Sequence, residues 1–188
     1  MYDKHYKKGG FGYDKNITTW KKWVKDHIVN SSKDKDNTLL DVGCGDGFWS
    51  VLLAPHFKDV KGSDISKGGI EVANKRKEKL QLKNVRFEDM DTLEEKDSFD
   101  VIFARSPSFL NENPNSEKFK KGLKKLISLC NKRIIFVTST STPYGPRGNN
   151  YFHDPQVIKK IFSKYGKAEC KMGGAYLIAT IDVKHKDE

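Results

Sequence analysis

The chain has no long apolar segment. None of its hydrophobic runs approaches the roughly 20 residues that a membrane-spanning helix needs. Its first residues, MYDKHYKK, are polar and charged, which is not the pattern of a secretory signal. We therefore expect a soluble, cytoplasmic protein that has no membrane partner. Nothing in the sequence indicates its oligomeric state.

Cysteine is scarce and scattered. The three thiols, Cys44, Cys130 and Cys170, lie far apart and form no CxxC pair, so the sequence offers no zinc-type spacing. Their odd number in a chain of 188 residues argues against a disulfide framework. No acidic cluster is typical of a magnesium site either. The sequence therefore predicts no metal and free thiols in a reducing compartment.

Acidic residues are outnumbered, 25 against 35 basic ones, which gives a net charge of +10. Such a surplus can indicate an anionic partner. However, only five of the basic residues are arginines, the type that binds phosphates and guanines in a bidentate way. The many lysines are dispersed along the chain, so nucleic acid is a possible but less favoured partner.

Apolar segments of two kinds alternate along the chain, short strand-like runs and longer runs with helical spacing. This alternation predicts an α/β fold with a doubly wound, mostly parallel seven-stranded sheet, helices on both faces and a C-terminal antiparallel hairpin. The expected strands are 38–43, 59–63, 84–89, 98–104, 133–139 and two that meet at Gly173–Gly174 within 167–183. The expected helices are 17–29, 48–54, 67–82, 116–130 and 154–165. Residues 1–30 form an N-terminal arm and helix, and 31–188 the main domain.

A glycine-rich turn follows the first expected strand, in the sequence LLDVGCGDG at 39–47. A buried strand ends at Asp41, and glycines at alternate positions then lead into a helix. Glycine adopts unusual dihedral angles and lets a ligand lie directly on the backbone. The start of the helix is expected to direct N–H groups toward a ligand carboxylate. A tight strand–helix turn without a ligand remains the alternative.

Two further acidic positions end the neighbouring expected strands. Asp64, 21 residues beyond Gly43, is placed to accept hydrogen bonds from both hydroxyls of a ribose. Asp91 ends the third strand, where it could accept from an adenine amino group, and Met90 beside it could contact the ring. Asp89 competes with Asp91 for this position. Asp64 could instead serve as a helix N-cap, although Ser66 suits that role.

Together these three elements resemble the class I S-adenosylmethionine-dependent methyltransferases over residues 37–138. The resemblance implies S-adenosylmethionine as cofactor and S-adenosylhomocysteine as product. It assigns the methionine part to the glycine turn, the ribose to Asp64 and the adenine to Asp91. The predicted cofactor-binding residues are Asp41, Gly43, Cys44, Gly45, Gly47, Asp64, Ile65, Met90, Asp91, Arg105 and Tyr6 of the arm. A nicotinamide dehydrogenase fits less well, because its fingerprint is G-x-G-x-x-G and not G-x-G-x-G.

The segments after the fourth and fifth strands are expected to bind the methyl acceptor. The sequence Ser106-Pro107-Ser108-Phe109 is similar to the motif of enzymes that methylate amino groups of nucleic acids, but it lacks the second proline. The long polar loop that follows the fifth strand ends at His153, which titrates near neutrality and is the candidate general base. The alternative is a histidine at a helix start without a chemical role.

These features predict a methyltransferase that acts on a small-molecule acceptor. An RNA or DNA methyltransferase is one alternative, since the arm interleaves aromatic residues with lysines. A cofactor-binding interaction protein without turnover is another. The same arm, with Tyr6, could instead cover the cofactor as a lid.

Overall fold

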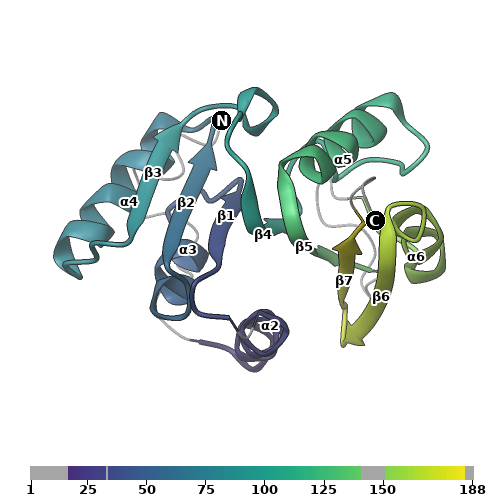
Figure 1. The fold of residues 1–188 in the computed structure, drawn as a ribbon, viewed down its shortest axis with the longest axis horizontal. Coiled ribbons are helices and arrows are strands. Elements are labelled where there is room, and N and C mark those ends of the chain that lie inside the picture. Colours follow the sequence, from purple (N-terminus) through teal and green to yellow (C-terminus); the bar gives the residue numbers. More distant parts are fainter. Residues whose placement is uncertain (1–16, 33, 141–150, 185–188) are drawn as a thin grey trace. The chain divides into compact units, whose positions relative to one another are not determined.

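The structure is a computed structural model, and it describes residues 17–32, 34–140 and 151–184. The chain divides into two compact units, Met1–Glu95 and Lys96–Glu188 (Figure 1). The first unit holds helices α2 (Thr19–Ser31), α3 (Phe48–Leu53) and α4 (Lys67–Lys79), strands β1 (Thr38–Val42), β2 (Asp59–Asp64) and β3 (Val85–Asp89), and the 3-10 turns η1 (Ala54–His56) and η2 (Thr92–Glu94). The second holds β4 (Phe99–Arg105), α5 (Glu117–Leu129), β5 (Cys130–Ser139), α6 (Pro155–Phe162), β6 (Gly166–Gly173) and β7 (Tyr176–Val183).

The three strands of the first unit are parallel, and α3 and α4 pack on one face of them (Figure 1). The register aligns Asp41 of β1 with Gly62 of β2, and Gly62 with Phe87 of β3. A Cβ atom at Gly62 would lie 2.7 Å from the Phe87 ring, so glycine is needed for that ring to cross β2. The ring also fills the space beside Gly47, which leads from the strand into α3. The apolar core of this unit therefore lies directly under the glycine turn.

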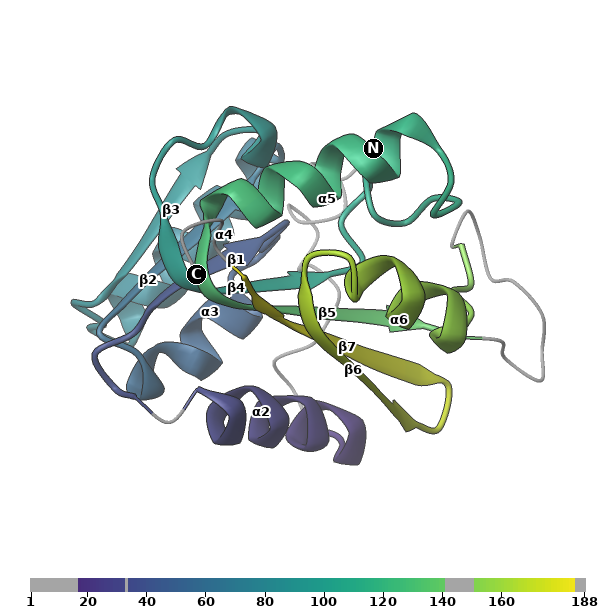
Figure 2. The ribbon, with the colours of Figure 1, turned by 45° about the vertical axis from the view of Figure 1, so that its right-hand side comes forward.

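The second unit combines a parallel pair, β4 and β5, with two antiparallel pairs, β5–β7 and β6–β7. The last two strands form the expected hairpin, whose turn contains Gly174 at φ +59°. Helix α6 packs across β6 and β7, and Figure 2 shows it lying in front of both strands. Asp154 caps this helix by accepting from the N–H groups of Gln156 and Val157.

The sheet order β3-β2-β1-β4-β5-β7-β6 confirms the expected fold class, a mostly parallel seven-stranded sheet with helices around it and an antiparallel C-terminal hairpin. Three boundaries differ from the expectation by three residues. Helix α4 ends at Lys79 and not at residue 82, because Gln81 has a positive φ of 53°. Strand β5 begins at Cys130, three residues early, because α5 passes directly into it. Helix α6 ends at Phe162, since the next residues form a tight turn before β6.

The predicted N-terminal part, residues 1–30, lies partly outside the described residues. Its described helix, α2, packs against α3 through Trp20 and Trp49, whose ring centroids are 6.0 Å apart. The boundary at residue 30 stays a prediction. Within the part of the chain that the structure describes, no helix is long and apolar enough to span a membrane.

Candidate functional site

The glycine turn after β1 has the backbone that its sequence predicts. Gly43, Gly45 and Gly47 all have positive φ angles, 68°, 54° and 73°. A side chain at any of these positions would strain the backbone, because L-residues other than glycine seldom adopt this region. Gly43 is exposed and the other two are buried. The turn therefore presents bare backbone at its outer end.

Asp64, the last residue of β2, connects three segments. Its Oδ2 atom accepts from the Gly45 N–H at 2.9 Å, and its Oδ1 atom accepts from the Ser66 N–H at 2.8 Å, just before α4. Its main-chain oxygen accepts from the Met90 N–H at 3.1 Å, just after β3. The structure thus brings the glycine turn, the end of β2 and the end of β3 together at one residue.

The N–H groups of the glycine turn are used within the protein. Those of Gly43 and Cys44 donate to the main-chain oxygen of Ser63, and that of Gly45 donates to Asp64. The N–H of Gly47 donates to the oxygen of Cys44 within the turn. These groups hold the turn against β2. The expectation for the N–H groups at the start of α3, which begins at Phe48, stays a prediction. Cys44 itself is buried, and burial raises the pKa of its thiol well above the usual value.

Asp41 is buried under the turn and has one side-chain partner in α3. Its Oδ2 atom accepts from the Ser50 hydroxyl at 2.6 Å. Burial, together with the nearby charges of Asp64 and Asp46, raises the pKa of Asp41 to about 7, although the hydrogen bond from Ser50 opposes the shift. The site therefore holds a carboxyl group that gains or loses a proton near neutral pH.

Further predicted cofactor-binding residues lie at the ends of β2 and β3, among them Met90 and Asp91, which were predicted to contact adenine. Ile65 follows Asp64 with 67% of its surface exposed, which is unusual for a large apolar side chain. Met90 is half-buried and Asp91 exposed, and the Asp91 carboxylate accepts from the Leu93 N–H at 2.9 Å at the start of η2. The competing residue, Asp89, lies 3.8 Å from the Lys67 ammonium group. An apolar surface and carboxylates thus occur beside the Asp64 junction.

Sequence reasoning missed the polar contacts that hold η2 against β2. The Ser63 and Thr92 hydroxyls are 2.8 Å apart, and the buried Lys61 ammonium lies 2.8 Å from carboxylate oxygens of both Glu88 and Glu95. Burial alone lowers the pKa of Lys61, yet the two carboxylates raise it above its usual value. These contacts fix the segment that carries Asp91. A lysine in the middle of a strand that was expected to lie inside a parallel sheet was the available signal.

In the second unit, the segment after β4 contacts the residues that precede α6. The Tyr151 N–H donates to the Asn111 side-chain oxygen at 2.9 Å, and His153 Nε2 lies 2.9 Å from the main-chain oxygen of Leu110. Phe109 is buried and lies over Gly122 of α5, where a Cβ atom would be 2.1 Å from its ring. Both expected acceptor segments therefore adjoin each other. Arg105 ends β4, while Tyr6 and residues 141–150 lie outside the described residues.

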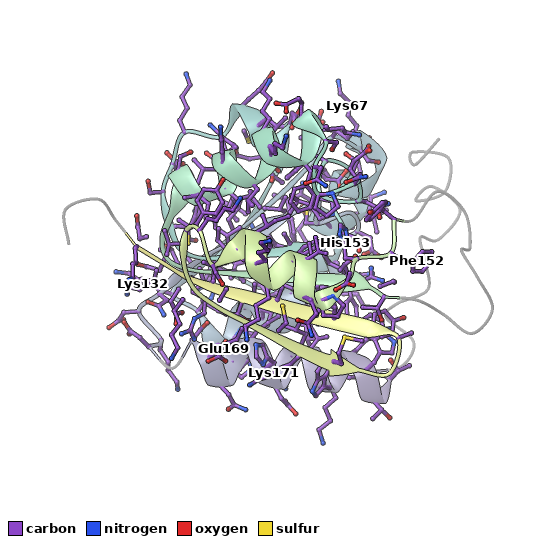
Figure 3. All side chains as sticks on the ribbon, turned by 90° about the vertical axis from the view of Figure 1, so that its right-hand side faces the viewer. Lys67, Lys132, Phe152, His153, Glu169 and Lys171 are labelled. Atoms are coloured by element: carbon purple, nitrogen blue, oxygen red, sulfur yellow. The ribbon has the colours of Figure 1, made fainter. Side chains whose placement is uncertain are left out.

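His153 is buried and not exposed at a helix surface, with 2% of its surface accessible. Its ring lies among Tyr151, Phe119 and Phe136, at centroid distances of 4.9, 5.8 and 5.5 Å, and Figure 3 shows it beside the start of α6. Burial lowers the pKa of His153 to about 4, so the ring is neutral at pH 7. With Nε2 on Leu110, these contacts favour a structural role over the predicted role as general base, which stays a prediction.

A family model described as a methyltransferase domain matches residues 33–182, which cover the larger part of each unit of the fold. The chain belongs to the class I S-adenosylmethionine-dependent methyltransferases. The family resemblance based on the glycine turn, Asp64 and Asp91 is confirmed.

Individual methyltransferases are similar over different lengths. The demethylmenaquinone methyltransferase of Oceanobacillus iheyensis is 28% identical over 71% of this chain, and the ubiquinone biosynthesis O-methyltransferase of Coxiella burnetii is 35% identical over 56%. The chain spans only 58% and 44% of the lengths of these relatives. The N-methyltransferase NodS of Bradyrhizobium japonicum, solved with S-adenosylhomocysteine, has the same fold, with a TM-score of 0.76, 16% identity and coverage of 98% of this chain and 97% of that one.

Replacement of Asp41 by Asn is expected to stabilise this methyltransferase at alkaline pH. Because the folded-state pKa of Asp41 is raised to about 7 from 3.8, the wild-type protein loses stability as the pH rises between these values. Asn can still accept from Ser50 and carries no charge. Urea unfolding measures the free energy of unfolding of both proteins from pH 4 to pH 8. Relative to the wild type, D41N should become more stable by about 2 to 4 kcal/mol between pH 4 and pH 8. Parallel curves for the two proteins would contradict the assignment.

Replacement of His153 by Gln is expected to remove a contribution to the free energy of unfolding that increases with pH, whereas the contribution of Asp41 decreases with pH. The pKa of His153 is lowered from 6.5 to about 4, so its contribution is present above pH 6.5 and is lost as the pH falls toward 4. The wild type should therefore be more stable than H153Q at pH 8, and this difference in the free energy of unfolding should be about 1 to 3 kcal/mol smaller at pH 4.5. Both proteins retain Asp41, so its titration cancels in the urea-unfolding comparison. An equal difference at both pH values would contradict the burial of a neutral ring.

Proposed function

We propose that the chain transfers a methyl group from S-adenosylmethionine to a small-molecule acceptor in the cytoplasm. The observation that carries this proposal is the Asp64 junction, where one carboxylate at the end of β2 contacts both the glycine turn and the start of α4. Class I methyltransferases need such a junction, because one ligand extends from its amino acid end to its nucleoside end across neighbouring strand ends. The three cysteines are free thiols, which suits a reducing compartment.

The residues of the first unit fit the cofactor. Asp64 would bind the ribose hydroxyls, since its half-exposed carboxylate can accept further hydrogen bonds besides those from the backbone. The exposed Ile65 and the half-buried Met90 would cover the adenine ring, and Asp91 would accept from its amino group. Bare backbone at Gly43 leaves space for the methionine part. When bound, S-adenosylmethionine supplies a methyl group that its sulfonium already activates.

The chain's contribution to the reaction is then chiefly orientation of the acceptor and exclusion of water. We assign this role to the two adjoining segments of the second unit, the one that follows Arg105 and the one before α6. His153 would act through its contact with Leu110, by fixing the two segments against each other. A hydroxyl acceptor would need a base to take its proton.

A small-molecule acceptor is supported by the relatives, whose names refer to demethylmenaquinone and to ubiquinone biosynthesis. An RNA methyltransferase is less well supported. The tRNA/tmRNA (uracil-C(5))-methyltransferase of Idiomarina loihiensis is similar over only 34% of this chain and 16% of its own length. The basic charge also comes mainly from lysines, as noted above.

Replacement of Asp64 by Ala is expected to weaken binding of S-adenosylmethionine about ten- to a hundredfold, because charge-assisted hydrogen bonds to the ribose are lost. Isothermal titration calorimetry measures the affinity. The matched control is Asp59→Ala, at the opposite end of the same strand, where the carboxylate pairs with Arg86. D59A should bind as the wild type does, and unchanged affinity in D64A would reject the ribose assignment.

The acceptor class is tested with S-adenosylmethionine that carries a radioactive methyl group. The protein is incubated with a whole-cell extract that has been divided by ultrafiltration into small molecules and macromolecules. We expect label to enter the small-molecule fraction, and treatment with ribonuclease to leave this signal unchanged. Label confined to ribonuclease-sensitive material would establish the RNA alternative. Cofactor binding without label in either fraction would favour an interaction protein without turnover.

A further inference from the structure

Asp46, which lies between Gly45 and Gly47 of the glycine turn, forms an ion pair with Arg76 of α4. Asp46 Oδ2 lies 3.2 Å from Arg76 Nη2, and its Oδ1 atom accepts from the Phe48 N–H at 3.3 Å. Both charged side chains are shielded, with 7% and 17% of their surfaces exposed. Because both charges are shielded from water, salt screens their attraction less than that of the exposed pairs of this unit, and the pair links the turn to α4.

Arg76 also changes the charge around the cofactor-binding turn. Three carboxyl groups, those of Asp41, Asp46 and Asp64, lie in or beside the turn, and the charges of the last two are felt at Asp41. The guanidinium of Arg76 contacts Asp46, one of these three groups. Removal of either member of the pair therefore changes the net charge next to the bound ligand by one unit. Removal of both members leaves the net charge unchanged.

We propose that the Asp46–Arg76 pair positions the glycine turn and sets the preference of the site for the methyl donor over its product. The proposal rests on the function proposed above. S-adenosylmethionine carries a positive sulfonium, whereas the sulfur of S-adenosylhomocysteine is neutral, and the two ligands otherwise share their charged groups. The ratio of their affinities therefore reports the electrostatic potential at the sulfur. A more negative net charge at the turn favours S-adenosylmethionine, and a more positive net charge favours S-adenosylhomocysteine.

The experiment measures the dissociation constants of both ligands by calorimetry for the wild type and for three variants. R76Q should shift the affinity ratio toward S-adenosylmethionine by about two- to tenfold, the range expected for one charge roughly 10 Å away. D46N should shift the ratio toward S-adenosylhomocysteine by a similar factor, and its amide can still accept from the Phe48 N–H. The double variant D46N/R76Q should restore the wild-type ratio while it binds both ligands more weakly, because the turn is less firmly held.

Two controls separate this charge effect from loss of structure. R86Q removes one positive charge from β3, where Arg86 pairs with Asp59 and contacts no residue of the turn, so its ratio should equal that of the wild type. R76K keeps the charge and should also keep the ratio. If R76Q unfolds, D46N and R76K still decide the question, since one changes the charge and the other does not.

The outcomes distinguish failure of this proposal from failure of the proposed function. A wild-type protein that binds neither ligand overturns both. A wild type that binds both ligands, with the same affinity ratio in D46N and R76Q, overturns only the proposal for Asp46 and Arg76. Opposite shifts in the two single variants, with recovery of the ratio in the double variant, support it. A merely structural role would weaken both ligands equally.

Discussion

The hydrogen bond from the Gly45 N–H to the Asp64 carboxylate is the interaction on which the candidate site depends. It joins the turn after β1 to the end of β2, and the Ser66 and Met90 N–H groups extend the same junction to α4 and to the end of β3. Parallel strands place their carboxyl ends at one edge of a sheet, but they do not fix the loops that follow. Here one acidic residue does so, and it is also the residue suited to a ribose.

Much of this arrangement could be predicted from the sequence, because its signals are local. The alternation of strands and helices defined the sheet, and the spacing from Gly43 to Asp64 placed a carboxylate beside the turn. Contacts between distant residues could not be predicted in the same way. The direction of the turn's N–H groups depends on Ser63 and Asp64, and the burial of His153 depends on rings from α5 and β5. A histidine before a helix carries no sign of such neighbours.

The first unit also shows the cost of a charged site in a small core. Asp41 is buried with only one side-chain hydrogen bond from Ser50, and other carboxylates lie near it, so its charged form is disfavoured. A core selected only for stability would contain an apolar residue or Asn here. A buried acid that is close to half-ionised at neutral pH is typical of functional sites and not of packing. On the opposite face of β2, by contrast, the acidic residues Glu88 and Glu95 are compensated by Lys61.

The charged groups around Lys61 and those at the glycine turn have different surroundings. Lys61 contacts two carboxylates and fixes η2 against β2. At the glycine turn the Arg76 guanidinium contacts Asp46, and the carboxyl groups of Asp41 and Asp64 also belong to this cluster, so these four groups carry a net negative charge even before Asp41 is ionised. A ligand with a positive sulfonium and an ammonium group reduces that imbalance, and it would favour the ionised form of Asp41. Under the function proposed above, binding of the donor and ionisation of Asp41 would therefore be coupled, since each stabilises the other.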